Sequence, residues 1–259
     1  MIKNQLRTFI DYRFLLLEFI KRDIKVKYKN SFLGIIWSIL EPLLNMIVLT
    51  FIFSSMFENS IPNFPIYVLS GRLLYGFFSQ SVTSCIKSIT GKSSLIKKIY
   101  VPKYIYPLSS VISNFIIFLL SLTPLFIIMI TSGLGPQKMN LLIIYPLGSL
   151  FFISFGLGLL LASINVFFRD LEHLFGIVLL IIMYMSAIFY SIDIIDPDYM
   201  YVMYLNPIFP PIVAFRDCIL YSEISSITSW VLCLVYPILY ILVGVFTFYN
   251  LQDKFILHI

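Results

Sequence analysis

The sequence predicts a single all-α integral membrane domain over residues 1–259, with six transmembrane helices. Hydrophobic residues make up 59% of the 259 residues and charged residues only 12%, and the mean hydropathy is +0.95. Apolar runs of about eighteen residues or more indicate transmembrane helices, and several such runs follow one another here with short polar breaks. A soluble domain is therefore excluded. The predicted spans are residues 33–57, 64–86, 105–131, 141–168, 174–190 and 228–250.

The first 29 residues predict a basic amphipathic helix before the first span. Such a helix lies in the headgroup layer, apolar face toward the lipid, with its basic side chains near anionic headgroups. A generic basic segment beside the membrane is the alternative. Charges that recur from Lys3 to Lys29 argue against a cleavable signal peptide. The expected apolar side holds Leu6, Ile10, Phe14, Leu17 and Ile24, and the expected polar side holds Arg7, Asp11, Glu18, Arg22 and Lys25.

Two residues interrupt the first predicted span. Pro42 removes a backbone donor and is expected to kink the helix. Glu41 is an ionisable group about two turns inside the span, at ~1.5 Å per residue. Because lipid does not solvate a carboxylate, Glu41 either faces the bundle interior in a functional role or pairs with a basic residue of the preceding helix. Both interpretations stay open.

A short basic segment, residues 90–110, separates the second and third spans. Serines are expected to cap a brief helix, lysines to form an exposed basic pair, and prolines to stop the helix before the next span. These roles fall to Ser93 and Ser94, to Lys97 and Lys98, and to Pro102 and Pro107.

No catalytic, metal or nucleotide site is predicted. Gly91-Lys92-Ser93 copies the end of a phosphate-binding loop, but Ile86 stands where the first glycine of that loop belongs. The three cysteines and two histidines are widely spaced and lack the spacing of metal ligands. We therefore expect no enzyme activity in this chain alone.

Proline and glycine shape the third and fourth spans. Pro124 predicts a kink in the third span. Glycines on one side of a spanning helix permit close approach to a neighbouring backbone, so the fourth span is expected to be packed deeply. Its glycines are Gly148, Gly156 and Gly158.

Residues 191–227, between the fifth and sixth spans, are not a plain loop. Their apolar stretches are too short to cross a core of ~30 Å, and they predict two re-entrant half-helices on the outer side, surrounded by protein or a water-filled cavity. Asp193, Asp196 and Asp198 have a spacing that suggests cation binding. Pro197 and the lack of further carboxylates nearby favour an exposed turn instead.

The distribution of basic residues predicts the orientation. Fifteen of the eighteen Lys and Arg residues fall on the side that holds both termini and residues 90–110. The positive-inside rule then places that side in the cytoplasm. The net charge of +5 is thus a topology signal, and a nucleic-acid partner is not expected. The opposite side holds Arg72, Lys138 and Arg216.

Several motifs, in order along the chain, resemble the membrane (permease) subunits of ABC exporters for lipid-linked polysaccharides, the O-antigen, capsule and teichoic-acid family. The chain differs from that pattern at Arg72, where an apolar residue is expected, and at Ser186-Ala187, where Ser-Pro is frequent. The matching motifs are Arg22–Lys29 with Trp37 and Glu41-Pro42-Leu43, Leu95–Lys103 with Pro107-Leu108, Arg169–His173, and Asn206-Pro207 with Phe215-Arg216.

The resemblance implies contacts with a partner ATPase. An interface helix carries Arg22, Lys25 and Lys27, and residues 90–110 contain the cytoplasmic coupling helix. ATP and Mg²⁺ would bind to the partner, and no cofactor to this chain. The implied contact residues are Ser93, Lys97, Lys98, Pro102, Lys103, Arg169, Asp170 and His173.

The resemblance also implies a conduit between two copies of the subunit and a gate on the outer side. Sugar rings stack on aromatic side chains, by analogy with bases on single-strand-binding proteins, although an aromatic belt at the membrane interface explains many of the same residues. Arg72 either snorkels to the outer surface or binds a phosphate of the lipid-linked substrate. The candidate conduit residues are Trp37, Glu41, Tyr75, Phe78, Tyr184 and Tyr190, and the outer gate residues are Asn206, Pro207, Phe215 and Arg216.

The predicted function is that of the transmembrane subunit of an ATP-driven exporter of lipid-linked polysaccharide, with O-antigen as the leading substrate. It would act in the cytoplasmic membrane as a homodimer with two ATPase subunits. Teichoic-acid or capsule export is the close alternative. Two more distant alternatives are a secondary transporter and a membrane-embedded glycolipid enzyme. The first would need ionisable residues at mid-membrane in several helices, but the predicted spans are nearly uncharged. The second would need clustered acids or histidines, and the one acid cluster lies in the turn around Pro197.

Overall fold

The computed structural model describes residues 11–29, 31–57, 61–98, 101–135 and 137–258 and contains only helices, turns and loops in those ranges. The expected all-α class is confirmed. The helices are α2 (Arg13–Lys27), α3 (Trp37–Phe57), α4 (Phe64–Ile86), α5 (Ser93–Ile96), α6 (Ile105–Ser121), α7 (Thr123–Thr131), α8 (Ile144–Phe167), α9 (Leu171–Tyr184), α10 (Met200–Tyr204), α11 (Phe209–Arg216), α12 (Ile227–Leu251) and α13 (Phe255–His258).

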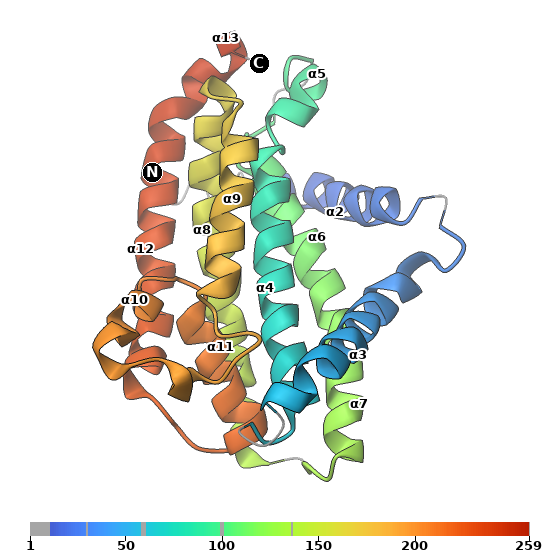
Figure 1. Cartoon of the computed structure of the whole chain (residues 1–259). Helices are drawn as coiled ribbons and strands as arrows, with labels where there is room; N and C mark the ends of the chain where they lie inside the picture. The colour runs from blue at the N-terminus through green and yellow to red at the C-terminus, as the bar shows by residue number, and fades with distance from the viewer. Residues whose placement is uncertain (1–10, 30, 58–60, 99–100, 136, 259) are drawn as a thin grey trace.

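A bundle of long helices forms the body of the molecule. Helices α4, α6 with α7, α8, α9 and α12 run side by side, α2 lies across them, and α3 leaves the bundle obliquely (Figure 1). Four helical segments are long and apolar enough to cross a membrane, namely Gly34–Phe53, Ile105–Thr131, Lys138–Phe167 and Ile227–His258. The chain is therefore a multi-pass membrane protein.

Helix α4 is the centre of the bundle although it is not among those four segments. It has 23 residues, but Arg72 and several serines lower its hydropathy. Most of its side chains are nevertheless buried, and it packs against α3, α6, α8 and α11. The protein rather than lipid therefore surrounds most of α4.

Helices occupy the six predicted spans with bounds close to the predicted ones, except at two places. The third span is broken at Leu122, between α6 and α7, as expected just before Pro124. The fifth span was predicted over residues 174–190, but α9 ends at Tyr184 and has 14 residues, which span only ~21 Å at ~1.5 Å per residue.

The early end of α9 has a physical cause. Ala187 adopts a positive φ of 46°, which turns the chain out of the helix. The Asn206 side chain donates hydrogen bonds to the Ile182 and Met185 carbonyl oxygens, at 3.1 and 3.0 Å. These are among the carbonyl groups that a helix end leaves without a partner.

Close packing of α8 against α12 confirms part of the glycine prediction. A Cβ atom on Gly156 would lie 2.4 Å from the Tyr240 carbonyl carbon, and one on Gly244 would lie 2.1 Å from the Gly156 oxygen. Gly158 similarly faces Cys85, whereas Gly148 faces open space and is not a contact. The two backbones thus approach each other directly at Gly156 and Gly244.

Helix α2 packs on α6 through a face that only partly matches the predicted apolar side, because Ile24 alone of the predicted residues that the structure describes packs there. Leu16, Phe19 and Ile20 are buried against the bundle, whereas Phe14 and Leu17, expected on the apolar side, are 67% and 49% exposed. The expected positions 1–10 lie outside the described residues. Helix α2 therefore carries two apolar faces, one against the protein and one free.

The helices between the predicted spans are short, as expected. Helix α5 begins at Ser93, and its N-cap is Lys92 without a side-chain capping bond. The prediction that Ser93 and Ser94 cap the helix is wrong because both lie inside its first turn. Between α9 and α12, α10 has five residues and α11 has eight, with a π-helical turn over Asp217–Tyr221.

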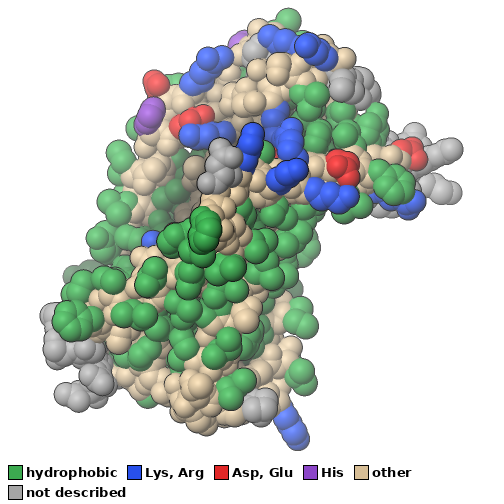
Figure 2. Space-filling view, turned by 90° about the vertical axis from the view of Figure 1, so that its right-hand side faces the viewer, with side chains coloured by type: hydrophobic (Ala, Val, Ile, Leu, Met, Phe, Trp, Pro, Cys, Tyr) green, Lys and Arg blue, Asp and Glu red, His purple; other side chains and the backbone are tan. Residues whose placement is uncertain are grey.

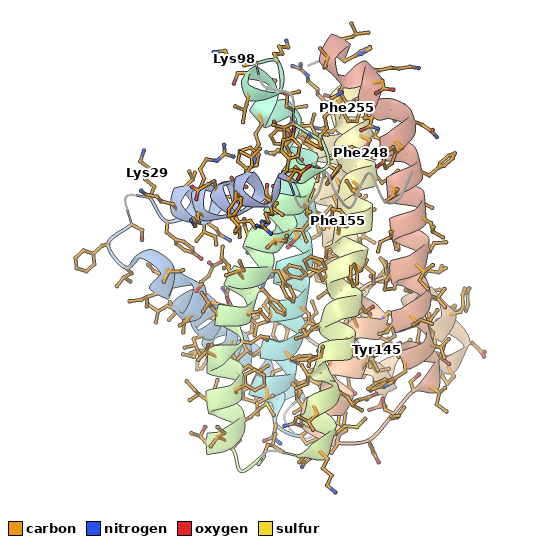
Figure 3. The ribbon with its side chains drawn as sticks, turned by 180° about the vertical axis from the view of Figure 1, so that it is seen from behind. Lys29, Lys98, Tyr145, Phe155, Phe248 and Phe255 are labelled. Carbon is orange, nitrogen blue, oxygen red and sulfur yellow. The ribbon has the colours of Figure 1, made fainter. Side chains whose placement is uncertain are left out.

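One end of the molecule is basic. Lys and Arg side chains gather at the end of the face that carries α2 and α5, and hydrophobic side chains cover most of the rest (Figure 2). Lys98 lies at this basic end, and Tyr145 of α8 lies at the opposite end (Figure 3).

Candidate functional site

A polar groove runs along one side of the bundle. It consists of two adjoining cavities of about 310 and 790 Å³, which share Lys27, Gln80, Asn114 and Ile117 as lining residues. The smaller cavity lies between α2, α3, α4 and α6. The larger cavity extends from it past α9 to residues Lys87–Lys92.

Helical spacing explains why α4 and α6 form the polar floor of this groove. On α4 the lining residues recur every three or four positions, and the same holds on α6, so each helix presents one stripe to the groove. Asn114 joins the stripes by donating a hydrogen bond to the Ser84 hydroxyl at 3.2 Å. The stripes are Arg72, Gly76, Gln80, Thr83, Ser84 and Lys87 on α4, and Ser110, Ser113, Asn114 and Ile117 on α6.

The larger cavity contains paired charges. The Lys92 ammonium lies 3.2 Å from the Asp23 carboxylate of α2, and Lys87 lies 3.2 Å from Glu172 of α9. Burial lowers the pKa of Lys92, and the Asp23 carboxylate opposes that lowering. Both lysines therefore tie the segment after α4 to a neighbouring helix.

The smaller cavity contains charged groups without such partners. Lys27 donates a hydrogen bond to the Gln80 amide oxygen at 2.5 Å. Arg72 Nη1 lies 3.7 Å from Met183 Sδ, a weak acceptor. Glu41 also lines this cavity, and none of the three takes part in an ion pair within the described part of the chain.

Glu41 and Arg72, for which two interpretations each were left open, line the same cavity. Glu41 faces the cavity together with Lys27 of the preceding helix, but no oxygen of its carboxylate is within 4.0 Å of the Lys27 ammonium. Arg72 is half-buried, and its guanidinium lies 5.8 Å above the Tyr75 ring. Its side chain thus lines the cavity within the bundle.

The predicted partner-contact residues all lie at the basic end, but some are exposed and others contact the chain itself. Lys97 and Lys98 are exposed after α5, and Arg169, Asp170 and His173 are exposed where α8 turns into α9. Lys103 instead donates a hydrogen bond to the Gln252 carbonyl oxygen at 2.5 Å. Lys103 therefore links the segment to the end of α12, while Ser93 and Pro102 are half-buried beside it.

The three named residues of the interface helix also differ. Lys25 is exposed, Arg22 forms an ion pair with its neighbour Asp23 at 2.9 Å, and Lys27 reaches the groove. Of these three residues only Lys27 lines the groove, where Asp23 and Val26 of the same helix join it.

The candidate conduit residues are not all brought together. Trp37 and Glu41 line the smaller cavity, and Tyr75 lines the larger one while donating its hydroxyl to the Leu179 carbonyl at 3.0 Å. Phe78 is fully buried in the core, so its ring does not reach the groove. Tyr184 and Tyr190 lie beyond the groove, and the Tyr190 hydroxyl donates to the Tyr184 carbonyl.

A second polar group, which we name the arginine cluster, consists of Tyr67, Asn206, Arg216 and Asp217. The Arg216 guanidinium donates to the Ala187 and Tyr67 carbonyl oxygens at 3.0 and 3.1 Å and lies 3.4 Å above the Tyr67 ring. Asp217 accepts hydrogen bonds from Ser225 and from Trp230 Nε1.

The four residues predicted to form an outer gate belong to this region and are all buried. Asn206 holds the end of α9, Phe215 is 0% exposed, Pro207 lies between them, and Arg216 is 1% exposed. A third cavity, of about 570 Å³, adjoins Tyr67 and Arg216.

Sequence reasoning missed the residues that make the groove polar. Gln80 and Asn114 stand alone inside apolar spans, and Asp23 was not distinguished from the other charges of its helix. A search for polar side chains that recur every three or four positions within an apolar span would have found both stripes.

Comparisons with known proteins found a matching family and several relatives that cover most of the chain. The model of the ABC-2 type transporter family matches residues 15–220. An O-antigen export system permease protein (RfbA) of Klebsiella pneumoniae is 29% identical over 230 residues, 85% of this chain and 88% of the relative. The protein of that name from Myxococcus xanthus is 32% identical over 194 residues, 74% of each chain. The polysialic acid transport protein KpsM of Escherichia coli is 22% identical over 212 residues, 79% of this chain and 81% of the relative.

Proposed function

The chain belongs to the ABC-2 type transporter family, and we propose that it is the membrane subunit of an exporter that carries a lipid-linked polysaccharide, most specifically O-antigen. It is a transport subunit, and the hydrolysis of ATP takes place in a separate partner. The observation that carries the substrate class is the polar groove, which reaches from the basic end to Arg72 in the middle of α4.

The chemistry of the groove suits a glycan. Hydroxyl groups moved from water into hydrocarbon without hydrogen-bond partners cost about 2–7 kcal/mol each. The serine, threonine and amide side chains of α4 and α6 supply such partners, while the lipid anchor of the substrate stays in the bilayer. The exposed ring of Trp37 offers an apolar surface on which a sugar ring can stack.

A second copy of the subunit would close the groove into a conduit. The groove is bordered by α2, α3 and α9 and is open on the remaining side. Apolar side chains of α3 and α9 are exposed beside it, among them Ile47, Phe51, Ile177 and Ile181. Burial of these faces against the same faces of a partner favours a homodimer.

The basic end would bind two ATPase subunits, which hold ATP and Mg²⁺. Lys97 and Lys98 are exposed and have no acidic partner among the described residues, so they are free to contact acidic side chains. Their neighbours Lys87, Lys92 and Lys103 are bonded to α9, α2 and the end of α12. A push on α5 would therefore move these helices together as packed bodies.

The membrane orientation follows from the charge distribution. Lysine and arginine are in excess in cytoplasmic segments of membrane proteins, so the basic end faces the cytoplasm. We propose six crossings, by α3, α4, α6 with α7, α8, α9 and α12, with both termini cytoplasmic and α10 and α11 as re-entrant half-helices on the outer side. The membrane is the cytoplasmic (inner) membrane.

Co-purification with a P-loop ATPase tests this function. The wild-type subunit should bring down an ATPase whose hydrolysis depends on the subunit, and the complex in proteoliposomes should move lipid-linked glycan to the far side. Replacing Lys97 and Lys98 by Glu should release the ATPase, because both side chains would then repel its acidic residues. Lys138→Glu, at the opposite end, is the matched control and should leave the complex intact. A purified subunit that transports without any ATPase would refute the proposal.

Capsular polysaccharide is the second candidate substrate. It is favoured by the similarity to a relative named for polysialic acid transport, which covers 79% of this chain. Reconstitution with defined lipid-linked O-antigen and capsule glycans separates the two, because only the true substrate should raise ATP hydrolysis and reach the far side.

A further inference from the structure

The smaller cavity of the groove holds two cations and one acid in a largely apolar bundle. Lys27 comes from α2, Glu41 from α3 and Arg72 from α4, and all three line the same volume of about 310 Å³. Ionisable groups inside spanning segments are costly and are functional candidates by default. The question is which group balances the two positive charges.

Arg72 has few partners within the protein. A guanidinium carries five N–H donors and no acceptor. Arg72 Nη1 lies 3.7 Å from the Met183 thioether, and the guanidinium lies 5.8 Å from the centre of the Tyr75 ring. No carboxylate oxygen of a described residue lies within 4.0 Å of it. Most of its donors therefore remain free to bind another molecule.

Lys27 is also without an acid at contact distance. Its ammonium donates to the neutral amide of Gln80. Partial burial lowers the pKa of Lys27, and the Glu41 carboxylate opposes this lowering, so the two charges interact across the cavity. One carboxylate facing two cations leaves the cavity with a net positive charge.

The adjoining larger cavity contains cations that do have carboxylate partners. There Lys87 and Lys92 each lie 3.2 Å from a carboxylate. Within the groove, the two lysines that link the segment after α4 to α2 and α9 are thus paired with carboxylates, whereas Lys27 and Arg72, which face the smaller cavity, are not. Such an arrangement is expected of a site whose counter-charge arrives with a ligand.

We propose that the smaller cavity is an anion-binding site that takes a phosphate or carboxylate group of the exported glycolipid. This inference rests on the proposed export function. Arg72 makes the bidentate contact with the oxyanion, and Lys27 makes a second contact from the cytoplasmic side. Glu41 balances part of the positive charge and weakens the site enough for the anion to leave again, as conduction requires.

Two sources supply this chemistry, the pyrophosphate of the lipid carrier and an acidic sugar of the glycan. Binding can be followed as quenching of the fluorescence of Trp37, which lines the cavity and is one of only two tryptophans in the chain. Three probes should be titrated into the purified subunit–ATPase complex, namely a polyprenyl pyrophosphate, a glucuronate-containing oligosaccharide and a neutral dextran oligosaccharide.

Arg72→Met and Lys27→Met should each weaken binding of the anionic probe by on the order of tenfold, the effect of one charged hydrogen bond. Arg72→Lys should recover part of the loss, and Lys138→Met, which removes a charge far from the cavity, should change nothing. Quenching by the pyrophosphate alone assigns the site to the carrier, and quenching by glucuronate alone assigns it to the glycan. Quenching by both assigns it to the shared oxyanion.

Equal binding of the wild type and both variants, or quenching by the neutral dextran alone, would overturn the anion site. Export by the unmodified complex is measured in the same preparation. If export proceeds while the anionic probes do not bind, the anion site is wrong and the export function stands. If no ATPase co-purifies, the export function itself fails.

Discussion

The arginine cluster and the smaller cavity each contain an arginine that has no carboxylate partner among the described residues and lies over a tyrosine ring, but the two arginines differ in burial and in hydrogen bonding. Arg216 is 1% exposed, and its guanidinium donates to two backbone carbonyl groups and stacks on Tyr67. Arg72 is partly exposed to a cavity and contacts a thioether. The protein supplies two carbonyl acceptors to the first arginine, whose Nε alone stays without a partner, and only a weak thioether acceptor to the second.

This difference separates structural from functional polar groups in an apolar bundle. Buried polar groups are tolerated when hydrogen bonds satisfy them, and Arg216 joins α11, the start of α4 and the turn after α9 in this way. Polar groups that stay open and unsatisfied, such as Arg72, are available to a passing substrate. The resemblance placed an outer gate at Asn206 and Arg216, which stays a prediction, and their contacts join the end of α9 to α11 and to the start of α4.

Removal of the Arg216 side chain should have the largest effect on stability. Arg216→Met removes two hydrogen bonds from a charged donor, at about 1.5–3 kcal/mol each, and leaves the Ala187 and Tyr67 carbonyl groups with only the Tyr67 and Ser70 hydroxyls as side-chain donors. We expect a lower free energy of unfolding by about 2–5 kcal/mol. The three cysteines are all buried, so a thiol-reactive fluorophore reports thermal unfolding in detergent. Arg169→Met, at an exposed position, is the control, and equal midpoints for the two variants would contradict the comparison.

Two glycines of α4 provide a smaller test. A Cβ atom on Gly71 would lie 2.7 Å from Arg216 Nη2 and 3.3 Å from Ile188, whereas one on Gly76 would meet nothing within 4 Å. Gly71→Ala should therefore displace the guanidinium and cost about 1–2 kcal/mol, as overpacking does. Gly76→Ala should be neutral or stabilising by up to about 1 kcal/mol, because alanine favours the helix. The same thermal assay measures both, and the reverse order would show that Arg216 is not fixed by its contacts.

Arg72→Met should have the smallest effect on stability. It removes a charge that has no ion pair within the described part of the chain, so the unfolding midpoint should stay within the range of a surface substitution, about ±0.5 kcal/mol. The unfolding midpoint of Arg72→Met can be compared directly with that of Arg216→Met, because both variants replace an arginine by methionine. A large loss of stability in Arg72→Met would mean that Arg72 is a structural residue as well.

The spans were predictable because their signals are local. Long apolar runs bounded by proline, glycine and charged residues place α3, α4, α8 and α12 within a few residues of their observed ends. The end of α9 was not predictable, because it depends on Asn206, a side chain more than twenty residues further along, and on the positive φ of Ala187.

The site was predictable only in part for the same reason. Exposed lysines such as Lys97 and Lys98 stand out from an apolar sequence wherever the helices pack. The groove arises only when the polar stripe of α4 packs beside that of α6, and Gln80 and Asn114 give no signal of it one at a time. Lys87, Lys92 and Lys103 are bonded to other helices, whereas Lys97 is exposed. This difference likewise depends on partners distant in sequence.

We propose that the exported glycan travels along the polar groove. A photo-crosslinking side chain at Thr83, which is exposed in the groove, should attach to the glycan during ATP-driven transport. The same side chain at Leu242, which is 65% exposed on α12 away from the groove, should attach to lipid only. Glycan attached at Thr83 and not at Leu242 is the predicted result, and glycan attached at Leu242 with none at Thr83 would contradict the account.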